Sequence, residues 1–149
     1  MYSDTITLFN RYESRLGDMW YPTVIKGVNL NIDKAAIIAK YGAESKDNAV
    51  LNIRYKVADG NVVIADKVYL PPKEWDRQTN DKLGETLTFT GGKDFDFFIA
   101  GEYGRTDPIA DDDYIDGFYN YINDYYDHAF AITSVAQYSV VPHFEIMGE

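Results

Sequence analysis

The sequence predicts a mainly β fold: a small antiparallel β barrel or sandwich with one acidic, tyrosine-rich helix before a C-terminal hairpin. Three observations predict it. Short runs of alternating apolar and polar residues recur along the chain, turn-forming residues separate them, and apolar residues at helical spacing occur in one stretch. The chain has 149 residues, of which 46% are hydrophobic, so we expect residues 1–149 to form a single domain with its own core.

The N-terminal part of the chain predicts two strands joined by a turn. Residues 4–9 alternate as in a half-buried strand, and residues 23–32 alternate again. The polar stretch 11–18 lies between them and is expected to form the hairpin tip. Pro22 favours an edge position for the start of the second strand, because proline has no N–H to donate to a sheet ladder.

The next segment, residues 35–48, is predicted to be a mobile loop or arm. Residues 35–41 are small and apolar, which fits a short helix and an extended arm equally well. Residues 42–48 are polar and small, which is typical of a loop.

The middle of the chain predicts further short strands. Residues 50–57 have apolar side chains at every second position, and Asp59-Gly60 is a turn signal. Other β-type runs occupy residues 62–65, 67–70, 85–90 and 95–100. No helix or strand is predicted for the polar stretch 73–80 around Trp75.

One helix is predicted, over residues 111–127. Asp111, Asp112 and Asp113 lie where N-cap and first-turn acids favour the helix dipole. An apolar stripe follows at three- and four-residue steps, made of Ile115, Phe118, Ile122, Tyr125 and Ala129. Two strand-like runs, residues 129–135 and 142–147, are expected to close the chain as a hairpin.

The net charge of −10 is concentrated at one end of the chain. Residues 1–105 carry 14 Lys and Arg against 15 Asp and Glu, whereas residues 106–149 carry nine acids and no Lys or Arg. A field of this sign repels phosphates, so tight binding of nucleic acid or anionic lipid through this end is excluded. The acids are either a solvated helix face or a contact surface.

Catalytic and metal-binding patterns are weak. The absence of cysteine excludes disulfides, thiolate zinc sites, iron–sulfur clusters and a cysteine nucleophile. The aspartates from Asp111 onward fail the calcium-loop pattern, because Ile115 and Asp116 stand where a ligand and a glycine are required. His128 and His143 have no nucleophile elbow beside them. We therefore expect no catalytic residue, no cofactor and no metal.

One enzymatic alternative stays open at this point. Asp94, Asp96 and Glu102 could supply a pair of carboxylates for general acid–base hydrolysis, although no lysine follows Glu102 as a metal-dependent nuclease core would require. No run approaches the roughly 20 apolar residues of a membrane span, and no signal peptide is visible. We expect a soluble protein that is made inside the cell.

Tyrosine is the least ordinary component of the sequence. The chain has 13 tyrosines, and six of them lie between residues 103 and 126. A short helix cannot bury them all, so some are expected to face a protein partner together with neighbouring acids. The candidates for this contact are Tyr114, Tyr119, Tyr121, Tyr126, Asp112 and Asp116. Two alternatives are tyrosines packed in the barrel and a β-sandwich module whose tyrosines stack on a carbohydrate.

The order of these features resembles the small head-completion (head-closure, or stopper) proteins of tailed bacteriophages and prophages. An opening strand of ITLFNRY type leads to the aromatic pair Trp20-Tyr21, and YLPPKEW (residues 69–75) resembles a segment of prophage proteins. The family's C-terminal hairpin pattern is matched by Ile132, Ser134, Val135, His143, Phe144, Ile146 and Gly148. The sequence departs from the family in its acidic helix, which is longer than expected there.

The resemblance implies a non-enzymatic structural protein of the virion neck, made in the cytoplasm of the bacterial host. Such proteins form a homo-oligomeric ring, six- or twelve-fold, between the portal–adaptor assembly and the tail, and they hold packaged DNA that passes the channel without specific binding. No membrane and no cofactor are implied. The channel loop would be residues 35–48, with Lys40, Glu44, Lys46 and Asp47 as its channel-facing candidates. An adaptor and a tail-completion protein are alternative positions in the neck.

Overall fold

The structure is a computed structural model and describes residues 2–32 and 49–149. The predictions for residues 35–48, including the channel candidates Lys40, Glu44, Lys46 and Asp47, fall outside the described residues.

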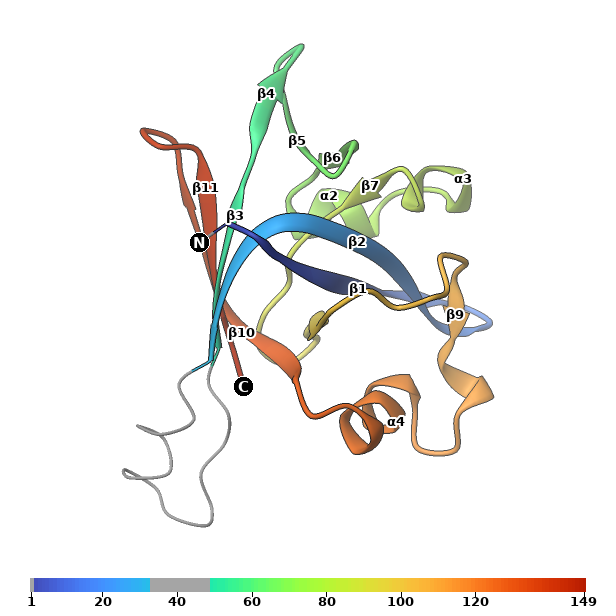
Figure 1. Ribbon diagram of the computed structural model, residues 1–149. Helices are drawn as coiled ribbons and strands as arrows, with labels where there is room; N and C mark the ends of the chain where they lie inside the picture. Colours follow the sequence, from blue (N-terminus) through green and yellow to red (C-terminus); the bar gives the residue numbers. More distant parts are fainter. Residues whose placement is uncertain (1, 33–48) are drawn as a thin grey trace.

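Six antiparallel strands form a closed barrel (Figure 1). In the order of their pairing around the barrel they are β1 (Asp4–Ser14), β8 (Phe97–Ala100), β10 (Ala129–Tyr138), β11 (His143–Gly148), β3 (Ala49–Arg54) and β2 (Gly17–Ile32). Pairing of β2 with β1 closes the circle. A two-residue strand, β9 (Ile109–Ala110), adds to β2 outside the circle. The predicted mainly β class and its barrel form are confirmed.

The first hairpin is longer than the sequence predicts. The pairing of β1 with β2 begins at Asp4 and ends at the pair Ser14–Gly17. The tip is therefore two residues long and does not include the whole stretch 11–18. Gly17 has φ 116°, a conformation that glycine adopts without strain, and the Ser14 hydroxyl donates a hydrogen bond to its carbonyl. The polar residues of this stretch continue the ladder because their side chains face solvent or the Arg11–Asp18 ion pair.

A second, smaller sheet contains β4 (Lys56–Ala58), β5 (Asn61–Ile64), β6 (Lys67–Tyr69) and β7 (Thr86–Leu87). The predicted turn at Asp59-Gly60 is confirmed, and both of its residues have positive φ. Strands β6 and β7 are parallel, and two short helices lie between them in the chain, α2 (Pro72–Asp76) and α3 (Asn80–Leu83). The expectation of a single helix is therefore wrong. Trp75 is the one buried residue of α2, and one apolar residue cannot show a helical period.

The helix predicted over residues 111–127 is shorter and interrupted. Residues Asp111–Asp113 form a 3-10 turn, η2, and the α-helix α4 covers Phe118–Tyr125. Gly117 separates them with φ 88°, which no helix accommodates. Of the predicted apolar stripe, Phe118 and Ile122 are buried and Ala129 belongs to β10. Ile115 is fully exposed and Tyr125 is 74% exposed, so the stripe is half the predicted length.

Alternation along the strands divides the buried side chains between the barrel interior and its outer face. Ile6 and Leu8 of β1 belong to the interior cluster, with Leu51, Phe98 and Phe144. The outer cluster lies between β1, β2, β8 and helix α4 and contains Phe9, Trp20, Phe97, Ile99, Ile109, Phe118 and Ile122. A third cluster seats α2 and α3 against β2 through Tyr21, Trp75 and Leu83.

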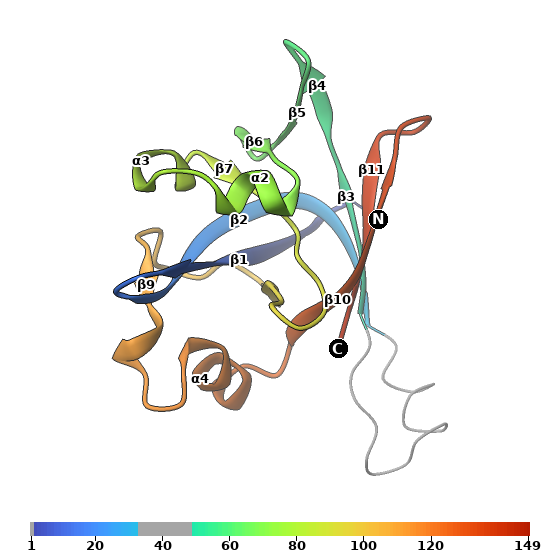
Figure 2. The same cartoon turned by 180° about the vertical axis from the view of Figure 1, so that it is seen from behind.

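Two hairpins extend beyond the barrel at the same end, as the two opposite views agree (Figures 1 and 2). They are β4–β5 and the outer part of β10–β11. Among the described residues, every helix is too short to cross a membrane.

Candidate functional site

Three tyrosines of the acidic end form a stepped row on the outer side of α4. The ring centroids of Tyr114 and Tyr121 are 4.7 Å apart, and those of Tyr121 and Tyr125 are 4.8 Å apart. Tyr121 and Tyr125 share one helix face because they are four residues apart. Tyr114 comes from the loop before the helix and rests on the buried Phe118, with centroids 5.1 Å apart.

Carboxylates border this row and create a concave, negatively charged surface. Asp113, Asp116 and Asp124 line a pocket of about 290 Å³ together with the three tyrosines, and no lysine or arginine is among the residues that line it. The Asn120 side-chain amide donates to the carbonyl of Asp116 at 2.7 Å, which braces one rim. We call Tyr114, Tyr121, Tyr125, Asp113, Asp116 and Asp124 the tyrosine face.

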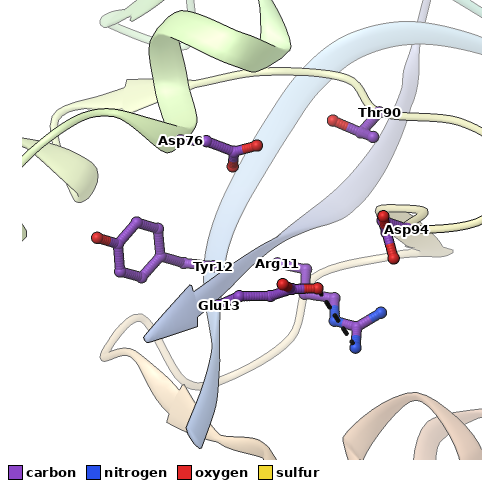
Figure 3. Close-up of a pocket in the computed structure, with 6 residues that line it drawn as sticks. All are labelled: Arg11, Tyr12, Glu13, Asp76, Thr90 and Asp94. Atoms are coloured by element: carbon purple, nitrogen blue, oxygen red, sulfur yellow. Dashed lines mark ion pairs between the residues drawn. The ribbon is translucent and has the colours of Figure 1, made fainter. Parts of the chain in front are cut away.

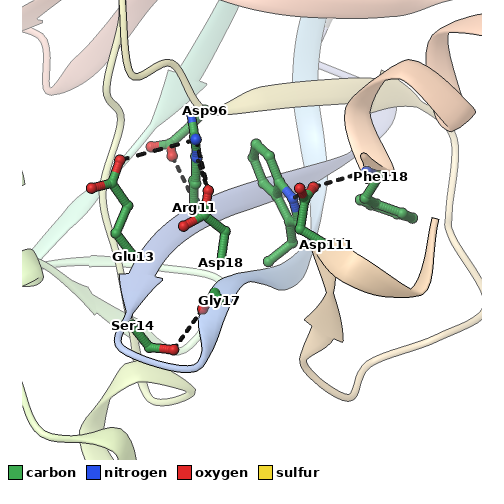
Figure 4. Close-up of polar contacts among 9 residues, drawn as sticks. Arg11, Glu13, Ser14, Gly17, Asp18, Asp96, Asp111 and Phe118 are labelled. Carbon is green, nitrogen blue, oxygen red and sulfur yellow. Dashed lines mark hydrogen bonds and ion pairs between the residues drawn. The ribbon is translucent and has the colours of Figure 1, made fainter. Parts of the chain in front are cut away.

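Asp111 attaches this segment to the barrel. Its Oδ1 accepts hydrogen bonds from the indole Nε1 of Trp20 and from the backbone N–H of Phe118, both at 2.9 Å. Figure 4 shows the bond between Asp111 and Phe118. The second bond satisfies a free N–H at the start of α4, where a negative charge also favours the helix dipole. Asp111 therefore accepts a hydrogen bond from the first turn of α4, as a capping residue does, although it lies in the 3-10 turn before that helix.

The structure separates the six predicted contact residues. Tyr121, Tyr114 and Asp116 belong to the tyrosine face. Tyr126 is 39% exposed but lies near Tyr103, with ring centroids 6.2 Å apart. Asp112 points toward the β1–β2 turn, where its Oδ2 is close to Gly17.

Tyr119 does not belong to the tyrosine face, because its side chain lies on another side of α4. Its ring packs against Phe95 and Phe97 at centroid distances of 4.8 and 4.9 Å. It borders a separate pocket of about 520 Å³ near Glu149. Tyr125 was predicted as a member of the apolar stripe, but it belongs to the tyrosine face. Tyr125 is the last residue of α4, and its four-residue spacing from Tyr121 is the signal in the sequence for their contact.

Beneath the tyrosine face lies Tyr103, which connects it to the outer cluster. Its ring makes edge contacts with Phe9 and Phe118. Burial, the neighbouring tyrosine hydroxyls and a hydrogen bond to Tyr114 raise the pKa of Tyr103 to about 12. This tyrosine therefore stays neutral and supports the exposed rings from below.

A second acidic pocket, of about 320 Å³, lies beside β1 (Figure 3). Glu13 of β1, Asp76 of α2 and Asp94 line it with Arg11, Tyr12 and Thr90. Arg11 binds Asp18 through Nη2 at 2.7 Å and through Nε at 3.0 Å, so its charge is already compensated. Burial and then the charges of Glu13 and Asp94 raise the pKa of Asp76.

Asp96 lies next to this pocket but is wholly buried. Its carboxylate accepts three hydrogen bonds of 2.9 Å, from the backbone N–H groups of Arg11 and Thr90 and from the Asn10 amide (Figure 4 shows Asp96 and Arg11). Burial raises its pKa to about 7, although the hydrogen bonds act in the opposite direction. Its role is to join β1, β8 and the chain before β8.

The three residues of the hydrolase alternative do not share one site. Asp94 lines the pocket, Asp96 is enclosed by its backbone partners, and Glu102 is exposed and does not line the pocket. Within the described ranges, no group of three or more His, Asp or Glu side chains is placed to hold a metal ion.

The tip of the β10–β11 hairpin carries uncovered apolar side chains. Val140 is 96% exposed and Val141 is 67% exposed. Behind them the Tyr138 and His143 rings stack at 4.8 Å, and the Tyr55 hydroxyl donates to the Tyr138 carbonyl at 2.8 Å. These contacts join the two strands and Tyr55 close to the exposed tip.

Comparison with known proteins yields one match. A family described as "Family of unknown function (DUF6751)" matches residues 1–149. No curated protein and no solved structure matches the chain.

Proposed function

We propose that this chain, which belongs to the DUF6751 family, is a ring-forming head-completion (stopper) protein of a phage neck. In this role it joins the portal–adaptor assembly to the tail and gates the DNA channel, as a structural component of the virion made in the host cytoplasm. The observation that carries the proposal is the β10–β11 hairpin, which links β8 to β3 within the barrel and extends an uncovered apolar tip beyond it.

The hairpin also lies in one of the two parts of the sequence that resemble the head-completion family most, which are roughly the first 30 and the last 20 residues. Ile132, Phe144 and Ile146 of that pattern are buried in the barrel interior. Gly148 pairs with Ile132, and a Cβ at Gly148 would lie 2.9 Å from the Cβ of Phe130. The pattern thus describes the packing of this hairpin in the barrel, and the residues between its two halves form the projecting tip.

An apolar tip favours contact with a second copy of the chain. Full burial of one valine side chain stabilises a contact by about 1.5–3 kcal/mol, and two valines are available at this tip. A tip that inserts into a different surface of the next copy makes a head-to-tail contact, and repeated head-to-tail contacts form a ring when the rotation from copy to copy closes. The proposed ring needs no catalytic residue, metal or cofactor.

The acidic end suits a channel through which DNA passes. Phosphates bind proteins mainly through lysine and arginine, and the acidic end presents carboxylates instead. DNA that approaches this surface is repelled and does not bind to it. Alternatively, the negative surface faces a basic patch on a neighbouring ring and sets the choice of partner.

Electron cryo-microscopy of the phage or induced prophage particles that contain the protein tests the proposal. We expect a ring of six-stranded barrels between the portal–adaptor assembly and the tail. Density in the capsid shell or in a tail fibre would overturn the proposal. Density in the adaptor ring or at the tail terminus would replace it with another neck component.

A nonsense mutation in the gene provides a second readout. We expect heads that package DNA, fail to retain it and carry no attached tail. Particles of normal DNA content and normal tail attachment would contradict a head-completion role.

A further inference from the structure

We propose that the tyrosine face is a docking site for an arginine side chain of a neighbouring protein. The site consists of the stepped rings of Tyr114, Tyr121 and Tyr125 and the carboxylates of Asp113, Asp116 and Asp124. Only the identity of the partner protein rests on the proposed function: in a phage neck, an adjacent subunit would present the arginine.

The size of the pocket suits one long side chain. Ligand pockets commonly have volumes of about 300–1,000 Å³, and the 290 Å³ of this pocket lies just below that range. Tyr121 and Tyr125 are 39% and 74% exposed, so ring surface is available to an incoming group. Packing of Tyr114 on Phe118 fixes one end of the row to the core.

The charge of the pocket favours a cation. Three carboxylates line it without a lysine or arginine among the lining residues, and their mutual repulsion is relieved when a positive group enters. Residues 106–149 contain no lysine or arginine in sequence, so the partner has to supply the charge.

Arginine fits the combination of rings and carboxylates better than lysine does. Its planar guanidinium stacks on an aromatic face and donates two parallel hydrogen bonds to a carboxylate, whereas an ammonium is a strongly hydrated point charge. The chain uses the same chemistry internally. The guanidinium carbon of Arg54 lies 4.0 Å from the Tyr2 ring centroid, and Arg11 binds Asp18 through two nitrogens beside Trp20.

Two other occupants are less compatible with these residues. A nucleic acid would bring phosphates to three carboxylates, which repel them. A neutral sugar can stack on the tyrosines but gains nothing from the net negative charge. The observations therefore favour a protein segment that presents an arginine.

The experiment is a titration of the ¹⁵N-labelled protein, followed by NMR, with the peptide acetyl-Gly-Arg-Gly-amide. The matched probes are the same peptide with citrulline, which has the shape of arginine without its charge, and with lysine. We expect saturable shifts confined to residues 113–125, strongest for arginine and absent for citrulline. Raising the salt concentration should weaken the binding, because exposed charges are screened.

Two variants locate the site. Tyr121→Ala should weaken the arginine peptide about 2- to 5-fold, which corresponds to an exposed cation–π contact of about 0.5–1 kcal/mol. The triple change Asp113→Asn, Asp116→Asn and Asp124→Asn should weaken it about 3- to 150-fold, because each exposed ion pair contributes about 0.2–1 kcal/mol. Circular dichroism confirms that each variant is folded.

Two control variants should bind as the unaltered chain does. Tyr138→Ala removes a tyrosine of similar exposure, 45%, from the β10–β11 hairpin. Asp59→Asn removes a carboxylate at the β4–β5 turn, where asparagine tolerates the positive φ of 53°.

Equal shifts from the citrulline peptide, or unchanged binding by the triple variant, would overturn the proposal. Saturable binding of a neutral oligosaccharide to these residues would overturn it in favour of a glycan site. The proposed function fails separately: peptide binding without a place in the neck would leave the docking site intact and remove the phage role.

Discussion

The barrel and the segment 101–127 are attached to the molecule in different ways. Each of the six barrel strands pairs with two neighbours, and Leu51 and Phe144 are wholly buried between them. The segment adds only the two-residue strand β9 to the sheet. It is held by buried aromatic contacts of Phe118 and by the hydrogen bonds of Asp111. Because few inner residues hold this segment, its outer side chains are free to form a binding surface.

The largest effect on stability is expected for a substitution in the barrel core. Phe144→Ala should lower the free energy of unfolding by about 3–5 kcal/mol, because it leaves a cavity among the rings of Tyr55, Tyr69 and Phe89. Urea unfolding measures this change, and amide hydrogen exchange should show loss of protection in all six strands. A loss confined to β11 would contradict the view that the barrel unfolds as one unit.

The buried Asp96 should make the barrel sensitive to pH. Its folded pKa of about 7 lies above the ordinary value of 3.8, so the folded state holds a proton that the unfolded state releases. The contribution of Asp96 to stability is therefore greatest below about pH 4 and falls as the pH rises toward 7, by on the order of 4 kcal/mol.

Urea unfolding at several pH values tests this with Asp96→Asn, which cannot ionise. We expect the free energy of unfolding of the unaltered chain to fall relative to the variant between pH 5 and pH 7.5. Glu102→Gln, at an exposed carboxylate, should not change the profile. Parallel profiles for the unaltered chain and Asp96→Asn would refute the assignment.

Loss of Asp111 should act on the attached segment more than on the barrel. Asp111→Ala leaves the indole N–H of the buried Trp20 and the N–H of Phe118 without their acceptor, at a cost of about 1–3 kcal/mol. Hydrogen exchange should speed up in α4 while the barrel strands keep their protection. Asp113→Ala, from the same 3-10 turn, is the matched control and should leave α4 protected. Equal effects of the two changes would contradict the anchoring role of Asp111.

The smallest effect on stability is expected at the hairpin tip, where the effect on assembly should be largest. Val140→Asp with Val141→Asp should change the free energy of unfolding by no more than about 0.5 kcal/mol, because both side chains face solvent. The variant should fail to enter the neck ring in particles. Leu16→Asp, at the equally exposed tip of the β1–β2 hairpin, should still enter it. Normal incorporation of the valine variant would show that the hairpin tip is not required for ring formation.

The candidate site shows where prediction from sequence stopped. Tyr119 and Tyr121 are two residues apart and have similar neighbours in sequence, yet the first packs on Phe95 and the second faces solvent. Residues two apart on a helix point to nearly opposite sides, so their spacing alone separates these two side chains. The packing of Phe118 and Ile122 against the barrel decides which of the two faces solvent.

The strands were predictable because alternation is a local property. Residues 50–57 show it, and Leu51 and Ile53 are buried in the barrel as that pattern indicates. The helix α2 was missed because its stability comes from one tryptophan packed on Tyr12 and Tyr21, more than 50 residues earlier in the chain. No pattern within α2 itself reports a contact of that kind.

The sequence by itself determined the mainly β class, most strand positions and the concentration of acids and tyrosines near the C-terminal end. Only the tertiary structure decided that β1 and β2 close a barrel, that Asp96 is enclosed by donors from Asn10 and Arg11, and which tyrosines share one face. The physical reason is the range of the interactions. Alternation and turn signals act between neighbours, whereas closure, burial of a carboxylate and a shared face depend on residues that are distant in sequence.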